Sequence, residues 1–311
     1  MVTRRSEPPT PGDRHDALSM TSKTHDVLDV HRASGRRFQA GGVSSFVREQ
    51  GSERSAPVVL LHGVPSSSFL YRKVLPVLAD QGMRGVAFDL PGLGLAERPD
   101  DFDYSWSGLA RWLGEAIDAL GLDRIHLVVH DIGGPIGCEW AVSDPERVLS
   151  LTVLNTMLDP ATFRRPWSMA PFATRGVGSA WLRGTPRPVF RRLFLQQGVA
   201  DRNAITPAEI DAYYYLLRRG DNGRAFLRIM RGFELTADKR RFLWAGLAKR
   251  PYPARIVWGE LDPALGLDQL DIARRVLGAD DVIRLPAKHF LQEDQAPAVA
   301  QAIADLAAPL G

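Results

Sequence analysis

The first candidate for a catalytic residue is Asp131, an acidic side chain near the end of an apolar run. Its surroundings, Leu127-Val-Val-His-Asp-Ile-Gly-Gly-Pro-Ile-Gly137, show an apolar strand pattern, then a polar residue, then small residues that open a helical pattern. This order is typical of a tight strand-to-helix turn that raises one side chain above the end of a sheet. A carboxylate held there could act as a nucleophile. The alternative is a helix N-cap, a position that Asp also favours.

Asp262 and His289 could complete a catalytic triad with Asp131. Each lies just after a short apolar run, 254–258 for the aspartate and 282–285 for the histidine. The carboxyl ends of parallel strands share one edge of a sheet, so three residues far apart in sequence can meet there. Their order along the chain, nucleophile, acid and then histidine, is the one that strand-end triads use. We therefore predict that His289 acts as a base oriented by Asp262.

Other interpretations of these residues stay open. Glu260 and Asp268 compete with Asp262 for the acid position, and a lone histidine is usually structural. The motif G-x-S-x-G is absent from the chain, which disfavours a serine esterase or lipase. The single cysteine, Cys138, excludes an internal disulfide and a C-x-x-C metal or redox site.

The segment His62-Gly-Val-Pro65 ends another apolar run. The backbone N–H groups of Val64 and Ile132 would meet at the shared edge of the sheet. Two such preorganised donors form an oxyanion hole, which stabilises negative charge as it develops. Removing one donor typically costs about 3 to 4 kcal/mol in the barrier, so we expect Val64 to matter through its backbone.

Strands that alternate with helices must position these residues. Short apolar runs bounded by turn residues predict buried strands, and apolar residues at helical spacing predict the helices between them. Such alternation indicates an α/β fold, with a mostly parallel sheet covered by helices on both faces. The predicted strands are 42–48, 57–61, 85–90, 124–130, 149–155, 254–258 and 282–285, and the predicted helices among them are 70–79, 106–120, 132–142, 269–277 and 296–307.

The alternation stops at Met157 and resumes near residue 251. Residues 157–250 show helical patterns at 188–195, 207–219 and 223–232, and no convincing strand pattern. Residues 156–250 hold 18 Arg and Lys against 7 Asp and Glu, a balance of +11, whereas the rest of the chain carries −8. Ligands of open parallel sheets bind beyond the carboxyl ends of the strands. We therefore predict that 157–250 is a basic helical lid over the site.

Length and composition limit the architecture further. The chain has 311 residues, of which 45% are hydrophobic and 24% charged, enough for a large core in one or two domains. We predict a core made of 37–156 and 251–311. Residues 1–36 are rich in Pro, Ser, Thr, Asp and His without apolar periodicity, which predicts a disordered tail.

The sequence shows no signal for a membrane or for export. No run approaches the roughly 20 apolar residues of a membrane span. Arg4 and Arg5 form a twin-Arg pair, but no apolar segment follows it, so we expect a cytoplasmic protein.

Five segments, in this order, carry a resemblance to a known family. They are His62-Gly-Val-Pro followed by Phe69-Leu-Tyr-Arg-Lys, Asp89-Leu-Pro-Gly-Leu-Gly, Val129-His-Asp-Ile-Gly-Gly, Gly259-Glu-Leu-Asp262 and His289-Phe-Leu-Gln-Glu-Asp294. From about Phe38 to its end, the chain resembles the α/β-hydrolase fold with an inserted helical lid. Within that fold it resembles the group with an aspartate nucleophile, the haloalkane dehalogenases and epoxide hydrolases.

The resemblance implies a two-step reaction that needs no metal or organic cofactor. Asp131 would attack an electrophilic carbon, displace a halide or open an epoxide, and form a covalent alkyl ester. His289, oriented by Asp262, would then deprotonate a water molecule that hydrolyses the ester. Asn155 stands where some dehalogenases carry the catalytic acid, and because an amide cannot balance an imidazolium, Asp262 is favoured.

The chain departs from both groups at the positions where the leaving group would bind. Many haloalkane dehalogenases place a Trp directly after the nucleophile, but this chain has Ile132 there. Trp181 stands near the position of a second Trp in one subgroup, and Trp167 is its rival, although either could simply pack the lid.

Epoxide hydrolases generally use two lid tyrosines to protonate the epoxide oxygen. Tyr213, Tyr214 and Tyr215 are consecutive on a predicted helix, so at about 100° per residue at most one or two can face the site. For the leaving group and substrate, our candidates are Trp181, Trp167, Tyr214 and Phe290.

We predict a hydrolase of the haloalkane dehalogenase type that acts on a small halogenated alkane. Epoxide hydrolysis to a vicinal diol is the alternative, and a non-catalytic binding protein of the same fold is a remote one. The basic lid is also compatible with an anionic substrate. No known nucleic-acid-binding module is present, so we expect no nucleic-acid or membrane partner, and a monomer or homodimer.

Overall fold

Parallel pairing dominates the sheet of the computed structural model, which describes residues 20–279 and 281–308. The described strands follow the order β1-β2-β4-β3-β5-β6-β7-β8. β2 pairs antiparallel with β1 and β4, and all other neighbours pair parallel. The strands are β1 (Arg36–Ala40), β2 (Val43–Gln50), β3 (Pro57–Leu61), β4 (Arg84–Phe88), β5 (Ile125–Asp131), β6 (Val148–Thr156), β7 (Ala254–Gly259) and β8 (Val282–Leu285).

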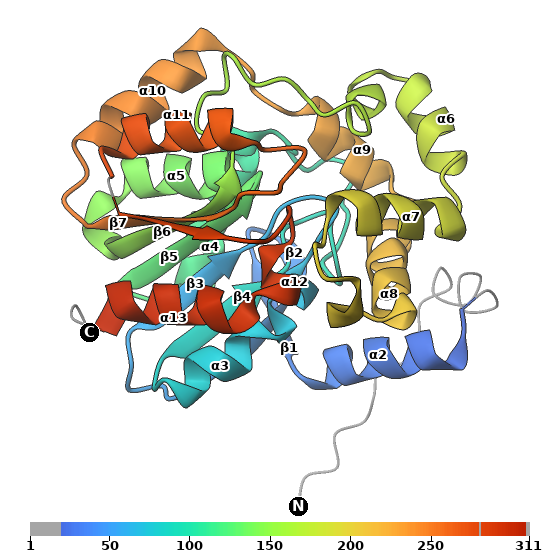
Figure 1. Ribbon diagram of the computed structural model, residues 1–311, viewed down its shortest axis with the longest axis horizontal. Helices are drawn as coiled ribbons and strands as arrows, with labels where there is room; N and C mark the ends of the chain where they lie inside the picture. Colours follow the sequence, from blue (N-terminus) through green and yellow to red (C-terminus); the bar gives the residue numbers. More distant parts are fainter. Residues whose placement is uncertain (1–19, 280, 309–311) are drawn as a thin grey trace, which may run out of the picture.

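Helices cover both faces of this sheet (Figure 1). α4, α5 and α11 pack on one face, and α3 and α13 pack on the other. The predicted α/β fold is therefore confirmed. The bounds of these elements are η1 (Ser68–Arg72), α3 (Val74–Asp80), α4 (Trp106–Ala119), α5 (Gly133–Ser143), α11 (Leu267–Leu277), α12 (Leu291–Asp294) and α13 (Ala296–Ala307).

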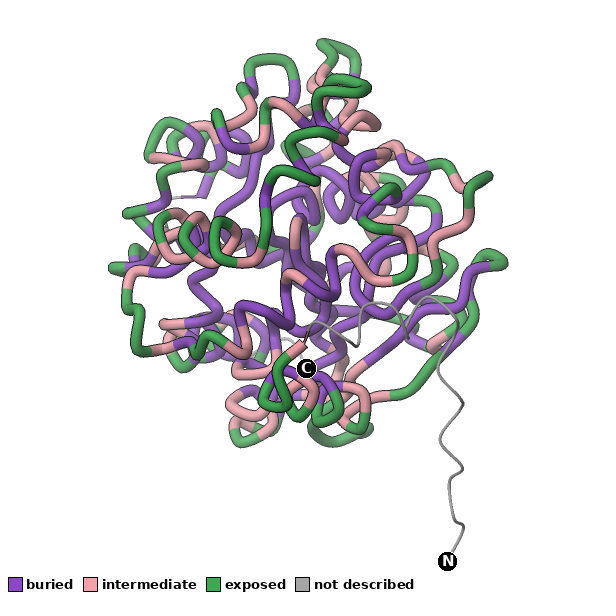
Figure 2. The backbone as a smooth tube through the Cα atoms, turned by 90° about the vertical axis from the view of Figure 1, so that its right-hand side faces the viewer, coloured by how far each residue is buried: buried purple, intermediate pink, exposed green. Residues whose placement is uncertain are grey.

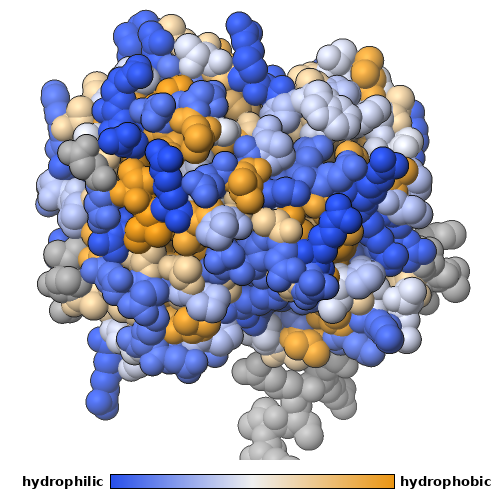
Figure 3. Space-filling view, viewed as in Figure 1, coloured by the Kyte–Doolittle hydropathy of each residue, from blue (hydrophilic) through white to orange (hydrophobic). Residues whose placement is uncertain are grey.

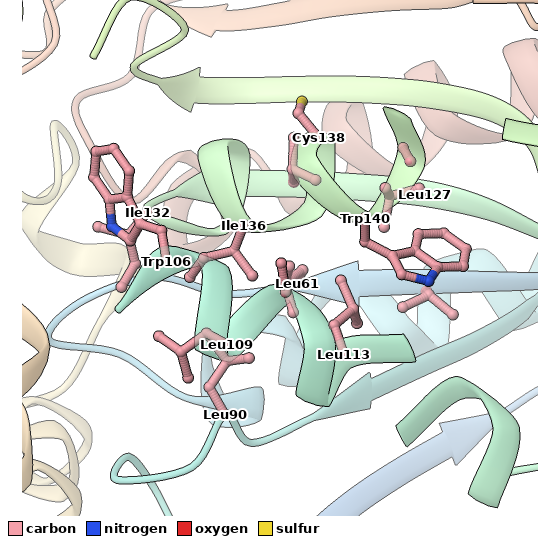
Figure 4. Packing of buried hydrophobic residues seen from close by; sticks show 14 of the residues in the cluster. Leu61, Leu90, Trp106, Leu109, Leu113, Leu127, Ile132, Ile136, Cys138 and Trp140 are labelled. Atoms are coloured by element: carbon pink, nitrogen blue, oxygen red, sulfur yellow. The ribbon is translucent and has the colours of Figure 1, made fainter. Parts of the chain in front are cut away.

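The continuous apolar run of β3 is explained by burial on both faces of the sheet. Side chains alternate along a strand, so Val59 and Leu61 join the apolar cluster on the α4 and α5 side, whereas Val58 and Leu60 join the cluster on the α3 and α13 side. Figure 2 shows buried backbone through the centre of the molecule and exposed residues at the outer turns. Figure 4 shows part of the first cluster, with Trp106, Leu109, Leu113, Ile132, Ile136, Cys138 and Trp140 packed around Leu61 and Leu127.

Seven predicted strands are confirmed as β2 to β8, with ends that differ by at most two residues. The first strand, β1, was not predicted because its sequence RRFQA buries only Phe38 and Ala40 and leaves three exposed polar side chains. It lies at the edge of the sheet, where one side of the strand has no neighbour to bury it.

The predicted disordered tail is wrong for residues 20–36. α2 (Ser22–Ala33) occupies most of this segment and packs against the lid helix α8. The helix is polar overall, so apolar periodicity could not reveal it; Leu28 and His31 nevertheless form a buried face. The tail prediction for 1–19 lies outside the described residues.

Residues 157–250 form helices and contain no strand in the structure. α6 to α9 gather beyond one end of the sheet, and α10 returns beside α5 and α11 (Figure 1). The predictions at 188–195, 207–219 and 223–232 correspond to α7, α8 and α9, whereas α6 and α10 were not predicted. The bounds are α6 (Val177–Arg183), α7 (Arg187–Gln197), α8 (Pro207–Arg218), α9 (Arg224–Arg231) and α10 (Ala237–Ala248).

An ion-pair cluster joins the lid to the core. Arg72 at the end of η1 contacts Glu209 of α8 (Nη2 to Oε1, 2.7 Å) and Glu293 of α12 (Nη1 to Oε1, 2.6 Å). The Tyr213 hydroxyl, also on α8, donates to Glu293 Oε1 at 2.5 Å. The Glu293 side chain is fully buried, and breaking such a buried pair is strongly destabilising. The cluster therefore fixes α8 against the segment that follows His289.

The surface seen in Figure 3 is mostly hydrophilic, with apolar residues in separate patches. Scattered apolar residues of this kind are normal for a globular protein. Within the described part of the chain, no helix is long and apolar enough to cross a membrane.

His31 on α2 is a buried histidine whose ring nitrogens both lack a hydrogen-bond partner. Its ring packs against Phe46 and Phe69, with centroids 5.1 and 5.2 Å away. Burial, aided by nearby arginines including Arg48, lowers the pKa of His31 well below its ordinary value. Burial also lowers the pKa of His126 in β5, to about 4.

We expect His31→Phe to reduce the loss of stability at mildly acidic pH. When the folded pKa of a histidine is lowered, protons bind preferentially to the unfolded state, so stability falls as pH drops below about 6.5. For one histidine the slope is about 1.4 kcal/mol per pH unit. Urea unfolding at about pH 7.5 and about pH 5 measures the change. Equal losses in wild type and variant would contradict this expectation.

Candidate active site

Asp131 occupies the turn between β5 and α5, as the sequence predicted. Its backbone φ is +53°, in the left-handed region that non-glycine residues rarely adopt and that often marks functional turns. Its Oδ1 accepts a hydrogen bond from the backbone N–H of Val64 at 2.7 Å. The backbone N–H of Ile132 also acts on this carboxylate and lowers its pKa. Both predicted donors thus converge on one side chain.

Two glycines allow close approach around this turn. A Cβ at Gly63 would lie 2.2 Å from Asp131 Oδ1, and a Cβ at Gly134 would lie 1.8 Å from Thr156 Oγ1. Thr156, the last residue of β6, donates its hydroxyl to the backbone carbonyl of Asp131. The neighbouring strand therefore holds the turn through a contact that any larger residue at 134 would block.

His289 and Asp262 reach Asp131 from the loops after β8 and β7. His289 Nδ1 lies 2.9 Å from Asp262 Oδ2, and His289 Nε2 lies 3.7 Å from Asp131 Oδ2. Asp262 Oδ1 accepts the backbone N–H groups of Ala264 at 2.8 Å and Leu265 at 3.1 Å. With the Nδ1 proton directed to Asp262, the lone pair of Nε2 points toward the nucleophile position.

The competing acids lie elsewhere. Glu260 and Asp268 are both exposed, and Asp268 Oδ2 accepts a hydrogen bond from Gln269. Asp262 is 5% exposed and contacts the imidazole directly. Of the three candidate acids, Asp262 is thus the one that the structure places against His289.

Burial and neighbouring charges shift the pKa values of Asp131 and His289. Burial raises the pKa of Asp131, and this effect outweighs the opposing effects of His289 and the two backbone N–H groups. Burial opposes protonation of His289, but Asp262 and Asp131 outweigh it and raise the pKa of the imidazole. Such opposing environments in one cavity are typical of catalytic groups.

A cavity of about 140 Å³ separates this cluster from the lid. Val64, Asp131 and His289 line it on the core side, and its lid side is mainly aromatic and aliphatic. The lid contributes a few polar residues to the lining: Arg165, Ser168, Trp181, Thr185, Gln197 and Arg218. A mostly apolar pocket with few polar groups suits a small, weakly polar ligand.

Comparisons with known proteins agree with this arrangement. Residues 56–296 match the alpha/beta hydrolase fold family. The chain is 31% identical over 299 residues to a haloalkane dehalogenase of Mycolicibacterium paratuberculosis, covering 94% of this chain and 96% of the relative. The chain belongs to the haloalkane dehalogenase group of the α/β-hydrolase fold family.

Solved structures of this α/β-hydrolase family superpose well on the chain. The haloalkane dehalogenase DbeA from Bradyrhizobium elkani gives a TM-score of 0.72 at 25% identity, covering 89% of this chain and 99% of that one. The epoxide hydrolase CorEH gives a TM-score of 0.72 at 21% identity, covering 89% and 99%, and at that identity the likeness shows the shared fold alone.

The candidate substrate-binding residues of this dehalogenase-group hydrolase lie in different places. Phe290 and Trp181 line the cavity. The Trp181 indole N–H donates to the backbone carbonyl of Ser168 at 3.2 Å, so it is already engaged. Trp167 is 67% exposed and is not a lining residue, and Tyr214 also lies away from the cavity. The structure thus brings two of the four candidates to the site.

The three consecutive tyrosines of α8 are all absent from the described cavity lining. Tyr213 points to Glu293, Tyr214 packs against Phe190, and Tyr215 lies beside Arg32 of α2. Helical spacing gives the angles between these side chains, whereas the neighbours of α8 decide which face meets the cavity.

Asn155 has a positioning role that sequence reasoning missed. Its Nδ2 donates to Asp262 Oδ2 at 2.9 Å and to the Gly259 carbonyl at 3.0 Å, while its Oδ1 accepts the Gly259 N–H at 2.7 Å. The side chain therefore fixes both the acid and the end of β7. The signal in the sequence was an amide at the end of a strand that neighbours the acid-bearing strand.

We expect Asn155→Ala to lower kcat by about 100-fold, because displacing a catalytic group by about 1 Å has effects of this size. KM should change little, since Asn155 does not line the cavity. Steady-state kinetics checks this, with Asn203→Ala as the control, at an exposed position of η4 (Arg202–Ala204). An unchanged kcat in a folded Asn155→Ala protein would contradict the positioning role.

Two buried histidines support the loops that carry the site. His130 Nε2 lies 2.8 Å from the backbone carbonyl of His289. His62 Nδ1 lies 2.9 Å from the Gly63 carbonyl, and His62 Nε2 accepts the Leu90 N–H at 3.0 Å. Burial lowers the pKa of both His62 and His130 and favours their neutral rings. His62 must be neutral for its Nε2 to accept the Leu90 N–H. Their places next to Gly63 and Asp131 were the available sequence signal.

Proposed function

We propose that this hydrolase cleaves carbon–halogen bonds in small apolar molecules through a covalent ester on Asp131. One observation carries the proposal. Asp131 Oδ1 is held by the Val64 N–H at 2.7 Å, while Oδ2 lies 3.7 Å from His289 Nε2 at the lining of an apolar cavity. One carboxylate oxygen is thus fixed and the other is placed to react.

In the first step Asp131 Oδ2 attacks the carbon that carries the halogen. A carbon–oxygen bond forms, the carbon–halogen bond breaks, and the halide leaves with the bonding electron pair. Burial of the carboxylate, which raises its pKa, removes water that would otherwise solvate the nucleophile.

In the second step His289 Nε2 takes a proton from water, and the resulting hydroxide attacks the Cγ of the ester. The negative charge develops on Oδ1, where the N–H groups of Val64 and Ile132 stabilise it. Collapse breaks the bond between Cγ and Oδ2, and His289 returns the proton to the departing alcohol. Haloalkane and water become alcohol, halide and a proton, and Asp262 balances the imidazolium between these events.

The cavity favours a halide over an epoxide. Opening an epoxide produces an alkoxide that must be protonated, and no tyrosine is among the described lining residues. A halide needs hydrogen-bond donors but no proton. The single triad would serve either leaving group, so the lid decides between them.

A single-turnover experiment in oxygen-18 water tests the mechanism. With enzyme in excess over a brominated alkane, the alcohol should carry oxygen-16 from Asp131 Oδ2, and the label should remain on the enzyme. Over many turnovers the alcohol should become labelled, because each hydrolysis replaces one Asp131 oxygen. Label in the alcohol of the first turnover would mean that water attacks the substrate directly, contrary to the proposal.

A further inference from the structure

The departing halide requires a hydrogen-bond donor, and most donors of the cavity are engaged elsewhere. The Trp181 indole donates to the Ser168 carbonyl at 3.2 Å, and the Thr185 hydroxyl donates to the Trp181 carbonyl at 2.8 Å. Arg218 donates to the carbonyl of Thr185 at 3.0 Å. Arg165 donates through Nη2 to the Met230 carbonyl at 3.0 Å and lies over the Phe233 ring, while its buried Nε has no partner among the described residues.

Gln197, the last residue of α7, is an uncharged donor among these lining residues. Its Oε1 accepts the Ser168 hydroxyl at 2.8 Å, which fixes the plane of the side-chain amide. Among the described residues, the structure gives its Nε2 no hydrogen-bond acceptor, although Gln197 lines the cavity. The half-buried amide thus offers two N–H bonds at the lining of a mainly apolar cavity.

The end of α7 is held next to the catalytic histidine. The Phe290 N–H donates to the Gly198 carbonyl at 2.8 Å, and a Cβ at Gly198 would lie 2.6 Å from the Phe290 ring. Lys288 Nζ donates to the Gln196 carbonyl at 2.8 Å. Because Lys288 and Phe290 flank His289, these contacts hold the end of α7, with Gln197, beside the loop that carries His289.

We propose that Gln197 Nε2 donates a hydrogen bond to the halide as it leaves the carbon attacked by Asp131. This inference rests on the proposed function and extends it to leaving-group specificity. An amide N–H stabilises an anion without giving up its proton. Gln197 therefore favours a halide, which leaves as a stable anion, over an epoxide oxygen, which needs protonation.

The first test is the leaving-group dependence of the alkylation rate, measured by rapid-quench kinetics on alkyl chloride, bromide and iodide. Gln197→Leu has a similar volume and removes the donor. It should slow alkylation of the chloride by about 100-fold, in line with the loss of one preorganised donor, and that of the iodide by less. Gln196→Leu, one residue away and exposed, is the matched control and should behave as wild type.

The second test needs no turnover. Bromide binding to the resting protein, followed by broadening of the bromide NMR signal, should be about tenfold weaker in Gln197→Leu, as expected for one hydrogen bond to an anion. Arg165→Leu should retain bromide binding. Wild-type bromide affinity in Gln197→Leu, or loss of affinity in Arg165→Leu instead, would overturn the assignment.

The two proposals fail in different ways. If no alkyl halide reacts with the wild-type protein, the proposed function fails, while bromide binding still reports on Gln197. If alkylation occurs and its leaving-group dependence is the same in Gln197→Leu, only the role of Gln197 is lost.

Discussion

Replacing His289 with glutamine should stop the reaction after its first step. The protein should then accumulate as the alkyl ester of Asp131. The first step needs only the carboxylate and the leaving-group donors, whereas the second needs a base at the position of Nε2. In the wild-type protein, Asp262 Oδ2 lies 2.9 Å from His289 Nδ1. Glutamine at this position can still hydrogen-bond to Asp262, but it cannot take a proton from water. General bases contribute about 10²- to 10⁴-fold, and hydrolysis of the ester should slow by a comparable factor.

Intact-protein mass spectrometry after incubation with a brominated alkane measures this directly. We expect a mass increase of one alkyl group, located on the peptide that contains Asp131, together with one equivalent of bromide. The double variant Asp131→Asn/His289→Gln is the control and should stay unmodified. An adduct on another residue, or full turnover in His289→Gln, would refute the assigned roles.

The variant Asp131→Asn should abolish turnover while making the protein more stable. Loss of a nucleophile that acts with its base costs on the order of 10⁶-fold in related triads. The amide still accepts the N–H group of Val64 through Oδ1, and Asn tolerates the left-handed φ of +53°. Because burial raises the pKa of Asp131, the charged form opposes folding above the unfolded pKa, and a neutral amide removes that cost.

The stability gain should depend on pH. A carboxylate with a raised folded pKa destabilises the protein increasingly as pH rises through the interval between its unfolded and folded values. The difference in melting temperature between Asp131→Asn and wild type should therefore be larger near neutral pH than near about pH 4. Equal melting temperatures at both pH values would show that the buried charge carries no folding cost.

The sheet and the triad could be predicted because their signals are local. The run 57–61 is apolar at every position since both faces of β3 are buried, and Asp131 stands directly between a buried strand and paired glycines. For Asp262 and His289, the loops after β7 and β8 meet at one edge by topology alone. Side-chain contacts were not required to anticipate any of these positions.

Side-chain direction in the lid could not be predicted in the same way. Tyr213 turns toward Glu293 because Arg72, far away in the sequence, brings a buried charge there. The N–H of Trp181 is taken by a backbone carbonyl of the lid itself. α2 was missed because only a few of its residues are buried, too few for a periodic pattern. In each case the deciding partner is a tertiary neighbour.

The contacts that tie the lid to the histidine loop also limit how molecules enter and leave. Lifting α7 and α8 as a flap would break the hydrogen bond between Phe290 and Gly198 and the ion pair between Arg72 and Glu209, and would disturb the loop of His289. Substrate and products should therefore pass by rotation of individual side chains at the cavity mouth. Such rotations take nanoseconds or less when side chains are exposed, far faster than collective helix motions. The entry of substrate and the exit of products would then leave the position of His289 unchanged during every turnover.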